Sequence, residues 1–545
     1  MLRFFSVLFI CLLCWQTMAE TAPFTPNTDP TLANLVKQLP RTKLQKMAPL
    51  VEKISQTNHP KTRDLLQYLM DGELYYIKSG RAVVRAQAGD NKQYILSDVL
   101  GEKTYQPVAK SKISKVKTNN RLRGTIRSLI AQIELTSPDK IVRLEAVKQL
   151  LDNPNDEGFA SIKRLVKTEP DQDVLNLMHI TLQLRQLQTG DHPQKMAAIE
   201  SLKDSLEPEV KNTFVEQLNA LPKKPDDEET KALQARLKKA IQNVQDKRDI
   251  YAVVENIFFG LSLGSVLLLA AIGLAITFGV MGVINMAHGE MIMLGAYTTY
   301  VVQLVFPHFI EYSLLIAVPA AFLVSGSVGI IIERCVIRFL KGRPLETLLA
   351  TFGISLILQQ LVRTVFSPLN RQVAAPEWMS GSWQINPIFS LTFNRLYIIL
   401  FSLMVFFALL MILKKSSLGL HVRAVSQNRD MARALSIKSD WVDAITFGLG
   451  SGIAGVAGVV LSQLTNVGPN LGQAYIIDSF LVVVFGGVGN LWGTLVAAMS
   501  LGSINKFLEP ITGSVLANII VLVGLVLFIQ KRPKGLFPQK GRSTD

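Results

Sequence analysis

Three polar residues lie at the end of a long uncharged stretch: Asn285, His288 and, directly after it, Glu290. Their side chains are of types that can bind a solute or take part in chemistry. The stretch runs for thirty-four residues, from Asn256 to Gly289, without Asp, Glu, Lys or Arg. Because a helix needs about 20 apolar residues to cross a bilayer, the three follow a membrane span. Polar side chains are costly there unless they meet water, one another or a solute. Two interpretations stay open: the three fix a turn that breaks the helix, or they contact a passing solute.

A second break is rich in glycine. It follows an apolar run, ends directly before Asn490, and contains Gly486, Gly487 and Gly489. A phosphate-binding loop would continue with Lys and Ser or Thr, which are missing, so no nucleotide site is expected. Broken helices line solute pathways, because unpaired backbone is tolerated in a membrane only inside protein or beside water. We interpret this break as a hinge or a pore-lining turn and expect both breaks to form a solute pathway.

The loop from Ser417 to Ile437 carries apolar residues at helical spacing between two apolar segments. Such an amphipathic helix fits the groove of a partner protein or lies on the membrane surface, and both remain open. In the first case, Arg423 and Arg429 would select the orientation of the partner. The apolar face would consist of Leu420, Val422, Val425, Met431 and Leu435.

The histidines and cysteines predict no metal or catalytic site. The three histidines ahead of residue 250 are scattered, without the paired spacing of metal ligands. Cys11 and Cys14 lie in an apolar leader, which leaves Cys335 without a disulfide partner once the leader is removed. We expect no metal, no cofactor bound by this chain and no enzymatic activity of its own.

Composition divides the 545 residues into two unlike parts. Residues 20–245 are charged and helix-like, whereas residues 246–538 hold nine apolar segments. The prediction is a mainly α protein, with a soluble domain followed by a polytopic membrane domain of about eight or nine spanning or reentrant helices. The segments lie at roughly 253–279, 286–306, 313–336, 345–365, 396–413, 441–464, 475–487, 490–508 and 512–530.

Charge and the N-terminus predict the topology. Residues 1–19 have the pattern of a secretory signal peptide, which places residues 20–245 outside the cytoplasm. The loops then expected inside carry fifteen Lys or Arg residues against three outside, so the net charge of +15 reflects the positive-inside rule and contact with lipid, not nucleic acid. The inner segments are 334–343, 414–438 and 531–545, of which 539–545 form a cytoplasmic tail.

The soluble part contains two further patterns. Arg143–Leu150 and Lys195–Leu202 lie fifty-two residues apart with Ala and Leu at matching places, which is typical of either a HEAT-like repeat pair or an ordinary helical bundle. Three β-prone runs, at 74–77, 82–84 and 94–96, predict a small hairpin or a three-stranded insert.

The stretch from Ile272 to Tyr297 resembles the opening of the permease subunits of branched-chain-amino-acid-type ABC importers. Among these it is most similar to the urea ABC transporter permease, which also has a long extension ahead of the permease. The resemblance covers about residues 250–538 and implies that Ser417–Ile437 is the loop that docks on the ATPase subunit. It assigns this coupling role to Gly419, Arg423, Ala424, Val425, Asn428, Ala432 and Leu435.

Ser436 departs from the family pattern. Relatives usually have glycine before the final isoleucine of the loop, and a turn that needs a positive φ would be strained by serine. The ending Lys531–Phe537 and the glycine-rich break at 486–493 both match the family.

The resemblance implies the transmembrane permease subunit of an ATP-binding-cassette importer in a bacterial inner membrane, moving a small polar nitrogen compound, urea first. The partners implied are cytoplasmic ABC ATPase subunits that hydrolyse ATP, a second related permease and a periplasmic solute-binding protein. An amide and a carboxylate could match the carbonyl and N–H groups of urea. The alternatives are a branched-chain amino acid or amide permease, and an ATP-independent urea or amide channel in which Glu290, Glu333 and Asp478 are proton or ion sites.

Overall fold

The structure, a computed structural model, describes residues 30–57, 59–88, 93–100, 104–152, 154, 156–222 and 227–537. The expected signal peptide at 1–19 and the tail at 539–545 lie outside the described residues. The chain divides into two compact units, Met1–Val244 and Gln245–Asp545.

The first part of the N-terminal unit is a helical layer on a small sheet. Its helices bury leucines at helical spacing, such as Leu65, Leu66 and Leu69 of α4, against Leu74 and Val83 of the sheet. Burial of these side chains is the main force that holds the short helices. The helices are α2 (Pro30–Gln38), η1 (Leu39–Arg41), η2 (Leu44–Lys46), α3 (Met47–Ser55), α4 (Thr62–Asp71) and α5 (Asn120–Glu134).

The sheet has five antiparallel strands in the order β4-β3-β2-β1-β5. The prediction of at most three strands was therefore wrong, because it missed β4 and β5. Tyr75 of β1 lies opposite Val84 of β2 and Lys115 of β5. Pro107 is tolerated because β4 is an edge strand. The elements are β1 (Leu74–Ile77), β2 (Val83–Ala88), β3 (Gln93–Asp98), β4 (Thr104–Ala109), η4 (Lys110–Lys112) and β5 (Ile113–Lys115).

A stack of helices follows. Ala146 and Leu150 of α6 and their counterparts Ala198 and Leu202 of α9 are all buried in one apolar core. The matched positions of the two sequence segments therefore have the same role in packing. The helices are α6 (Lys140–Asp152), α7 (Asp156–Leu165), α8 (Gln172–Thr189), α9 (His192–Leu202) and α10 (Pro208–Ala220).

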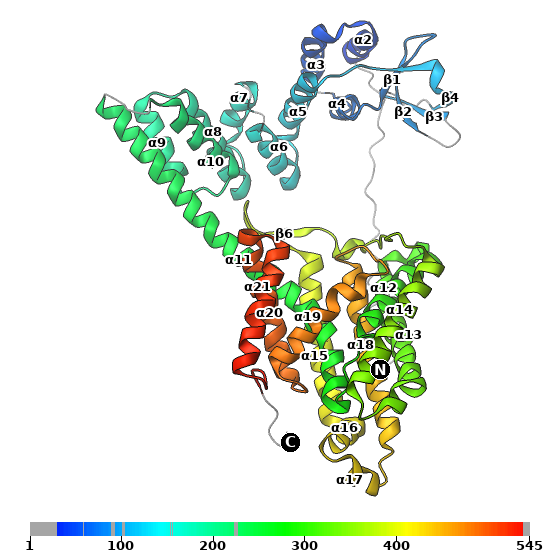
Figure 1. Ribbon diagram of the computed structural model, residues 1–545. Coiled ribbons are helices and arrows are strands. Elements are labelled where there is room, and N and C mark those ends of the chain that lie inside the picture. The colour runs from blue at the N-terminus through cyan, green and yellow to red at the C-terminus, as the bar shows by residue number, and fades with distance from the viewer. Residues whose placement is uncertain are drawn as a thin grey trace, which may run out of the picture. The chain divides into compact units, whose positions relative to one another are not determined.

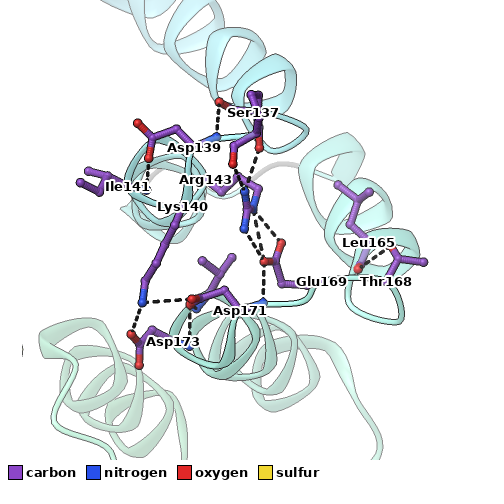
Figure 2. Close-up of polar contacts among 12 residues, drawn as sticks. Ser137, Asp139, Lys140, Ile141, Arg143, Leu165, Thr168, Glu169, Asp171 and Asp173 are labelled. Atoms are coloured by element: carbon purple, nitrogen blue, oxygen red, sulfur yellow. Dashed lines mark hydrogen bonds and ion pairs between the residues drawn. The ribbon is translucent and has the colours of Figure 1, made fainter. Parts of the chain in front are cut away.

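Figure 2 shows the polar contacts that fix α6 within this stack. The guanidinium of Arg143 donates to the Glu169 carboxylate (Nη2 to Oε1, 2.8 Å) and to the carbonyls of Ser137 and Pro138. Lys140 bridges Asp171 and Asp173 at the start of α8 and holds the pKa of the Asp171 carboxyl below its usual range. These charges join α6 to the turns before α6 and α8.

Over its described residues, the second unit consists mainly of nine apolar helices, which confirms the predicted polytopic helical membrane domain. In the described part of the chain, six helices are long and apolar enough to cross a membrane: α11, α13 with η5, α14, α15, α18 and α21. The nine are α11 (Glu228–Met281), α12 (His288–Val305), α13 (Ser313–Cys335), α14 (Pro344–Phe366), α15 (Phe393–Lys415), α18 (Ser439–Ser462), α19 (Leu471–Gly486), α20 (Leu491–Thr512) and α21 (Ser514–Lys531). The connections contain η5 (Pro307–Tyr312), η6 (Ile337–Leu340), η7 (Glu377–Met379), β6 (Ser382–Gln384), β7 (Ser390–Thr392), α16 (Ser417–Gln427) and α17 (Arg429–Ala434).

Helix α18 lies at the centre of a group with α12 and α13, and α19, α20 and α21 pack beside one another (Figure 1). Close approach of α12 and α18 depends on glycine, since a Cβ on Gly295 would lie 1.9 Å from the Gly455 carbonyl oxygen. Helices α16 and α17 lie at one end of this unit, at the bottom of the view in Figure 1.

Candidate functional site

The polar turn between α11 and α12 is held by its own side chains. α11 ends at Met281, and Gly282 directly after it takes a φ of +67°, in the left-handed region. The Asn285 Oδ1 accepts a hydrogen bond from the Ala287 N–H (3.0 Å), and the Met286 N–H donates to the Thr351 Oγ1 (3.1 Å). Asn285 thus shapes the turn.

His288 is fully buried and faces α11. Its Nε2 lies 2.9 Å from the carbonyl oxygen of Ala270. Its ring sits where two helices approach closely, because a Cβ on Gly273 would lie 2.8 Å from the His288 Cε1. His288 therefore ties the start of α12 to α11.

Glu290 points to a different helix, α14. Its Oε1 accepts hydrogen bonds from the Ser355 Oγ (2.8 Å) and the Gln359 Nε2 (2.7 Å). The structure therefore does not bring Asn285, His288 and Glu290 into one cluster. Each of the three residues bonds to the protein, as the turn-fixing interpretation expects, while the Glu290 Oε2 is buried without a hydrogen-bond partner among the described residues.

The glycine-rich break joins α19 to α20. Gly487 and Gly489 have φ values of +101° and +80°. The Asn490 Oδ1 accepts from the N–H groups of Trp492 (3.1 Å) and Gly493 (3.2 Å), which caps α20. Gly486 ends α19 in contact with Gly493, where a Cβ would lie 2.5 Å from the backbone. The turn is thus fixed by backbone geometry that most other residues would not allow.

The C-terminal segment covers this break. The Leu536 N–H donates to the Phe485 carbonyl (2.8 Å), and the Phe537 N–H donates to the Gly486 carbonyl (3.2 Å). The Asn490 Nδ2 donates in turn to the Phe537 carbonyl (3.2 Å). Three hydrogen bonds therefore attach the segment after α21 to the turn between α19 and α20.

The loop from 417 to 437 is two helices, α16 and α17, divided at Asn428. Asn428 leaves the helical region and its Oδ1 accepts from the Met431 N–H (3.0 Å), so it caps α17. Val422, Val425 and Ala432 are buried against Val442 of α18.

The expected apolar docking face was therefore wrong in part. Val422 and Val425 are 6% and 3% exposed, because they pack on the protein's own helices beside Val442 of α18. Leu420, Met431 and Leu435 remain outside, with 58%, 60% and 70% of their surface exposed. The remaining predicted residues divide likewise: Gly419 is buried, Ala424 is half-buried and Arg423 is exposed.

Neither arginine expected to orient a partner is free of internal contacts. The Arg423 guanidinium donates to the Leu413 carbonyl at the end of α15. Arg429 pairs with the fully buried Asp443 of α18 through two bonds, from Nη1 to Oδ2 (2.7 Å) and from Nη2 to Oδ1 (3.1 Å). Both side chains anchor the loop to the membrane helices.

Asp443 also receives a second cation. The Lys341 Nζ lies 2.6 Å from the Asp443 Oδ2, 3.1 Å from Asp440 and 3.8 Å from Glu333 of α13. A single buried carboxylate thus joins α17, α18 and the segment that follows α13. A displacement of α17 would therefore act through this carboxylate on α18 and on the segment after α13.

Ser436 does adopt the positive φ that its position suggested, at +65°. The Ile437 N–H donates to the Ala432 carbonyl and the Ser436 N–H to the Arg433 carbonyl, both at 3.0 Å. This is the helix-ending motif that favours glycine at the Ser436 position. The expected strain at this residue is confirmed as a left-handed, non-glycine conformation.

A cavity of about 430 Å³ is lined by residues from two of the predicted sites, the coupling loop and the glycine-rich break. It lies between the end of α11, the end of α15, α16 and the start of α20, and it is lined by Gly419 and Arg423 of the loop and by Gly489 and Asn490 of the break. The glycine-rich turn therefore lies beside the loop helices.

The comparisons with known proteins cover this unit. The family described as "Branched-chain amino acid transport system / permease component" matches residues 256–530, half of the chain. The chain belongs to this family. The permease resembles BraD, a high-affinity branched-chain amino acid transport system permease protein of Pseudomonas aeruginosa, with 28% identity over 299 residues, 53% of this chain and 96% of BraD.

Two further relatives each match about half of this chain. LivH of Escherichia coli K12, of the same description, is 29% identical over 293 residues, 52% of this chain and 94% of LivH. The ribose import permease protein RbsC of that organism is 26% identical over 287 residues, 51% of this chain and 85% of RbsC. No solved structure matches the permease.

Sequence reasoning missed Lys341 and Asp443 of this permease. Asp443 is the single carboxylate in the apolar run from Trp441 to Leu464. A lone charged residue in such a run is a signal that could have identified it. Its partner Lys341 is 102 residues away, and no local pattern points to it.

Proposed function

We propose that this permease is the membrane subunit of an ATP-driven importer for a small polar nitrogen compound, with urea as its first candidate. Family membership supports the coarser statement, a permease component of the branched-chain amino acid transport type. ATP hydrolysis falls to a separate chain, since the sequence contains no Gly-x-x-x-x-Gly-Lys-Ser/Thr motif. A second related permease and an extracytoplasmic solute-binding protein complete the importer.

The observation that carries the proposal is the exposed apolar face of α16 and α17. Leu420, Met431 and Leu435 are largely exposed, whereas the valines of the same loop are buried against α18. Large apolar side chains on such a surface are typical of a protein interaction site. The helices beneath are anchored through Asp443, so a partner that grips these three side chains would act directly on α18.

Charge supports the orientation that this docking requires. The segments 334–343, 414–438 and 531–545 carry fifteen basic residues, as cytoplasmic loops do. In this orientation the loop helices face a cytoplasmic ATPase, and residues 20–245 lie in the periplasm of a bacterial cell.

The docking is tested with a double variant, Leu420→Asp with Met431→Asp. Two charges in an apolar interface should abolish co-purification of the ATPase and uptake of labelled urea, while the permease still inserts. Ile141→Asp, which alters a 70% exposed isoleucine outside the loop, is the matched control. Unchanged co-purification and uptake in the double variant would remove the loop from energy coupling and favour the ATP-independent channel.

The solute is tested by competition. Cells that depend on this permease should accumulate labelled urea, short amides should compete, and leucine should compete weakly. The alternative solute is a branched-chain amino acid, which the names of BraD and LivH support for those relatives. Strong leucine uptake without urea uptake would establish that alternative.

A further inference from the structure

A second cavity of the permease unit, about 290 Å³ in volume, lies between α11, α19, α20 and α21. Its apolar wall includes Leu263 and Leu267 of α11. Its polar lining is unusual for helices of this apolarity. The polar side chains are Tyr475 and Asp478 of α19, Asn505, Lys506 and Glu509 of α20, and Ser514 and Asn518 of α21.

Asp478 is the only charged residue of α19. It is half-buried, and no hydrogen bond or ion pair joins its carboxylate to another of the described residues. A lone carboxylate within a membrane helix is costly unless water or a solute meets it. The cavity is where such a solute can reach it.

The other polar groups of the cavity largely satisfy one another. The Lys506 Nζ lies 2.5 Å from the Glu509 Oε2, which pairs the two opposite charges. The Asn505 Nδ2 donates to the Asn518 Oδ1 at 2.5 Å. Each of these amides still has a free N–H, and the Asn505 carbonyl remains a free acceptor. The cavity therefore offers one unpaired anion together with neutral donors and acceptors.

We propose that this cavity binds a neutral solute of the amide class, in which N–H groups donate to the Asp478 carboxylate and the carbonyl accepts from an asparagine amide. The inference rests on the proposed function and names the solute site within it. Urea and short primary amides have this pairing of donors and carbonyl. An amino acid would also need a cation for its carboxylate, and Lys506, the cation of this cavity, is already paired with Glu509.

The position of the cavity is that expected of a solute site that packed side chains separate from the loop end of the permease. Helices α11 and α20 line this cavity through Leu263 and Asn505, and they line the cavity beside the loop helices through Gly279 and Leu491. Asn505 and Leu491 are about 21 Å apart along a helix with a rise of about 1.5 Å per residue.

Buried apolar side chains fill the space between the two cavities. Leu268 and Ile272 of α11 pack there with Val483 of α19 and with Ala497 of α20. A solute at Asp478 is therefore separated from the loop end by packed side chains, as an importer at rest requires.

The experiment measures labelled urea uptake in Asp478→Asn and Asp478→Leu. We expect the KM for urea to rise about tenfold in Asp478→Asn, since a charged acceptor is lost, and uptake to vanish in Asp478→Leu. Ser479→Ala is the matched control, because Ser479 is the next residue of α19 and donates only to its own helix, to the Tyr475 carbonyl (2.7 Å). A KM unchanged in both Asp478 variants would overturn the inference and leave the proposed function standing.

A second readout does not depend on turnover. Ser514 lines the cavity and is exposed, so Ser514→Cys in a Cys335→Ser background should react with a membrane-impermeant maleimide. Urea at millimolar concentration should slow this labelling severalfold, leucine should not, and the protection should disappear in Asp478→Asn. Labelling that urea does not slow would overturn the inference. Absence of urea uptake by the unaltered permease would overturn the proposed function, and this inference with it.

Discussion

Replacement of Asp443 by asparagine should uncouple the loop helices from the membrane helices. The fully buried carboxylate takes two bonds from Arg429 and one from Lys341. Loss of one partner of a buried ion pair costs about 3–5 kcal/mol. Because the Arg429 and Lys341 side chains keep 29% and 26% exposure, water compensates part of the loss, and we expect about 2–3 kcal/mol.

This loss is larger than the free energy by which α17 could stay folded without its contacts to the membrane helices. The helix has six residues, and isolated helices shorter than about 12–15 residues are marginal in water. Asp443→Asn should therefore release α17, raise amide exchange across 429–437 and lower ATP-driven urea uptake at least tenfold, while the membrane helices stay protected.

The matched control is Asp440→Asn. Asp440 shares Lys341 (3.1 Å) and contacts Arg433 (3.4 Å), but its side chain is 59% exposed. Exposed pairs contribute about 0–1 kcal/mol, so uptake should change little. Normal amide protection and normal uptake in Asp443→Asn would refute the reasoning that this carboxylate transmits force.

Three further predictions concern single residues. Ser436→Gly should stabilise α17 by about 1 kcal/mol by removing a left-handed serine, seen as slower amide exchange there; faster exchange would contradict the strain. Gly295→Ala should lower the yield of folded permease, since its Cβ would lie 1.9 Å from the Gly455 oxygen, whereas Gly353→Ala, with open space at its Cβ, should not. Burial raises the pKa of Glu207, so the stability it contributes is present below its unfolded pKa of about 4.3 and is lost as the pH rises through the folded value. Glu207→Gln should accordingly slow exchange in α10 at pH 7 but not at pH 4, and the same effect at both pH values would refute the assignment.

Nine apolar helices could be predicted because each needs only length and apolar composition, which are local properties of the sequence. The strands β4 and β5 could not. Thr104–Ala109 contains Pro107 and little alternation, and Ile113–Lys115 is too short to show any, so pairing with β3 and β1 decides both.

The candidate site shows the same division. The capping role of Asn490 and the positive φ of Ser436 follow from neighbours in the sequence. The inward direction of Val425 and the pairing of Lys341 with Asp443 depend on how distant helices pack, and a helical pattern cannot distinguish a face that meets a partner from one that meets the protein itself.

The hydrogen bonds from Leu536, Phe537 and Asn490 that attach the end of the chain to the α19–α20 turn have a consequence for biosynthesis. This turn cannot be completed before residues 536 and 537 have left the ribosome, so it matures later than the helices α19 and α20 that it joins. A product that stops at Lys531 keeps all the apolar helices from α11 to α21 that the structure describes, but it lacks all three bonds. Its loosened turn would offer quality-control proteases a way to recognise the shortened chain, and a fusion joined directly after Lys531 would produce the same defect in the laboratory.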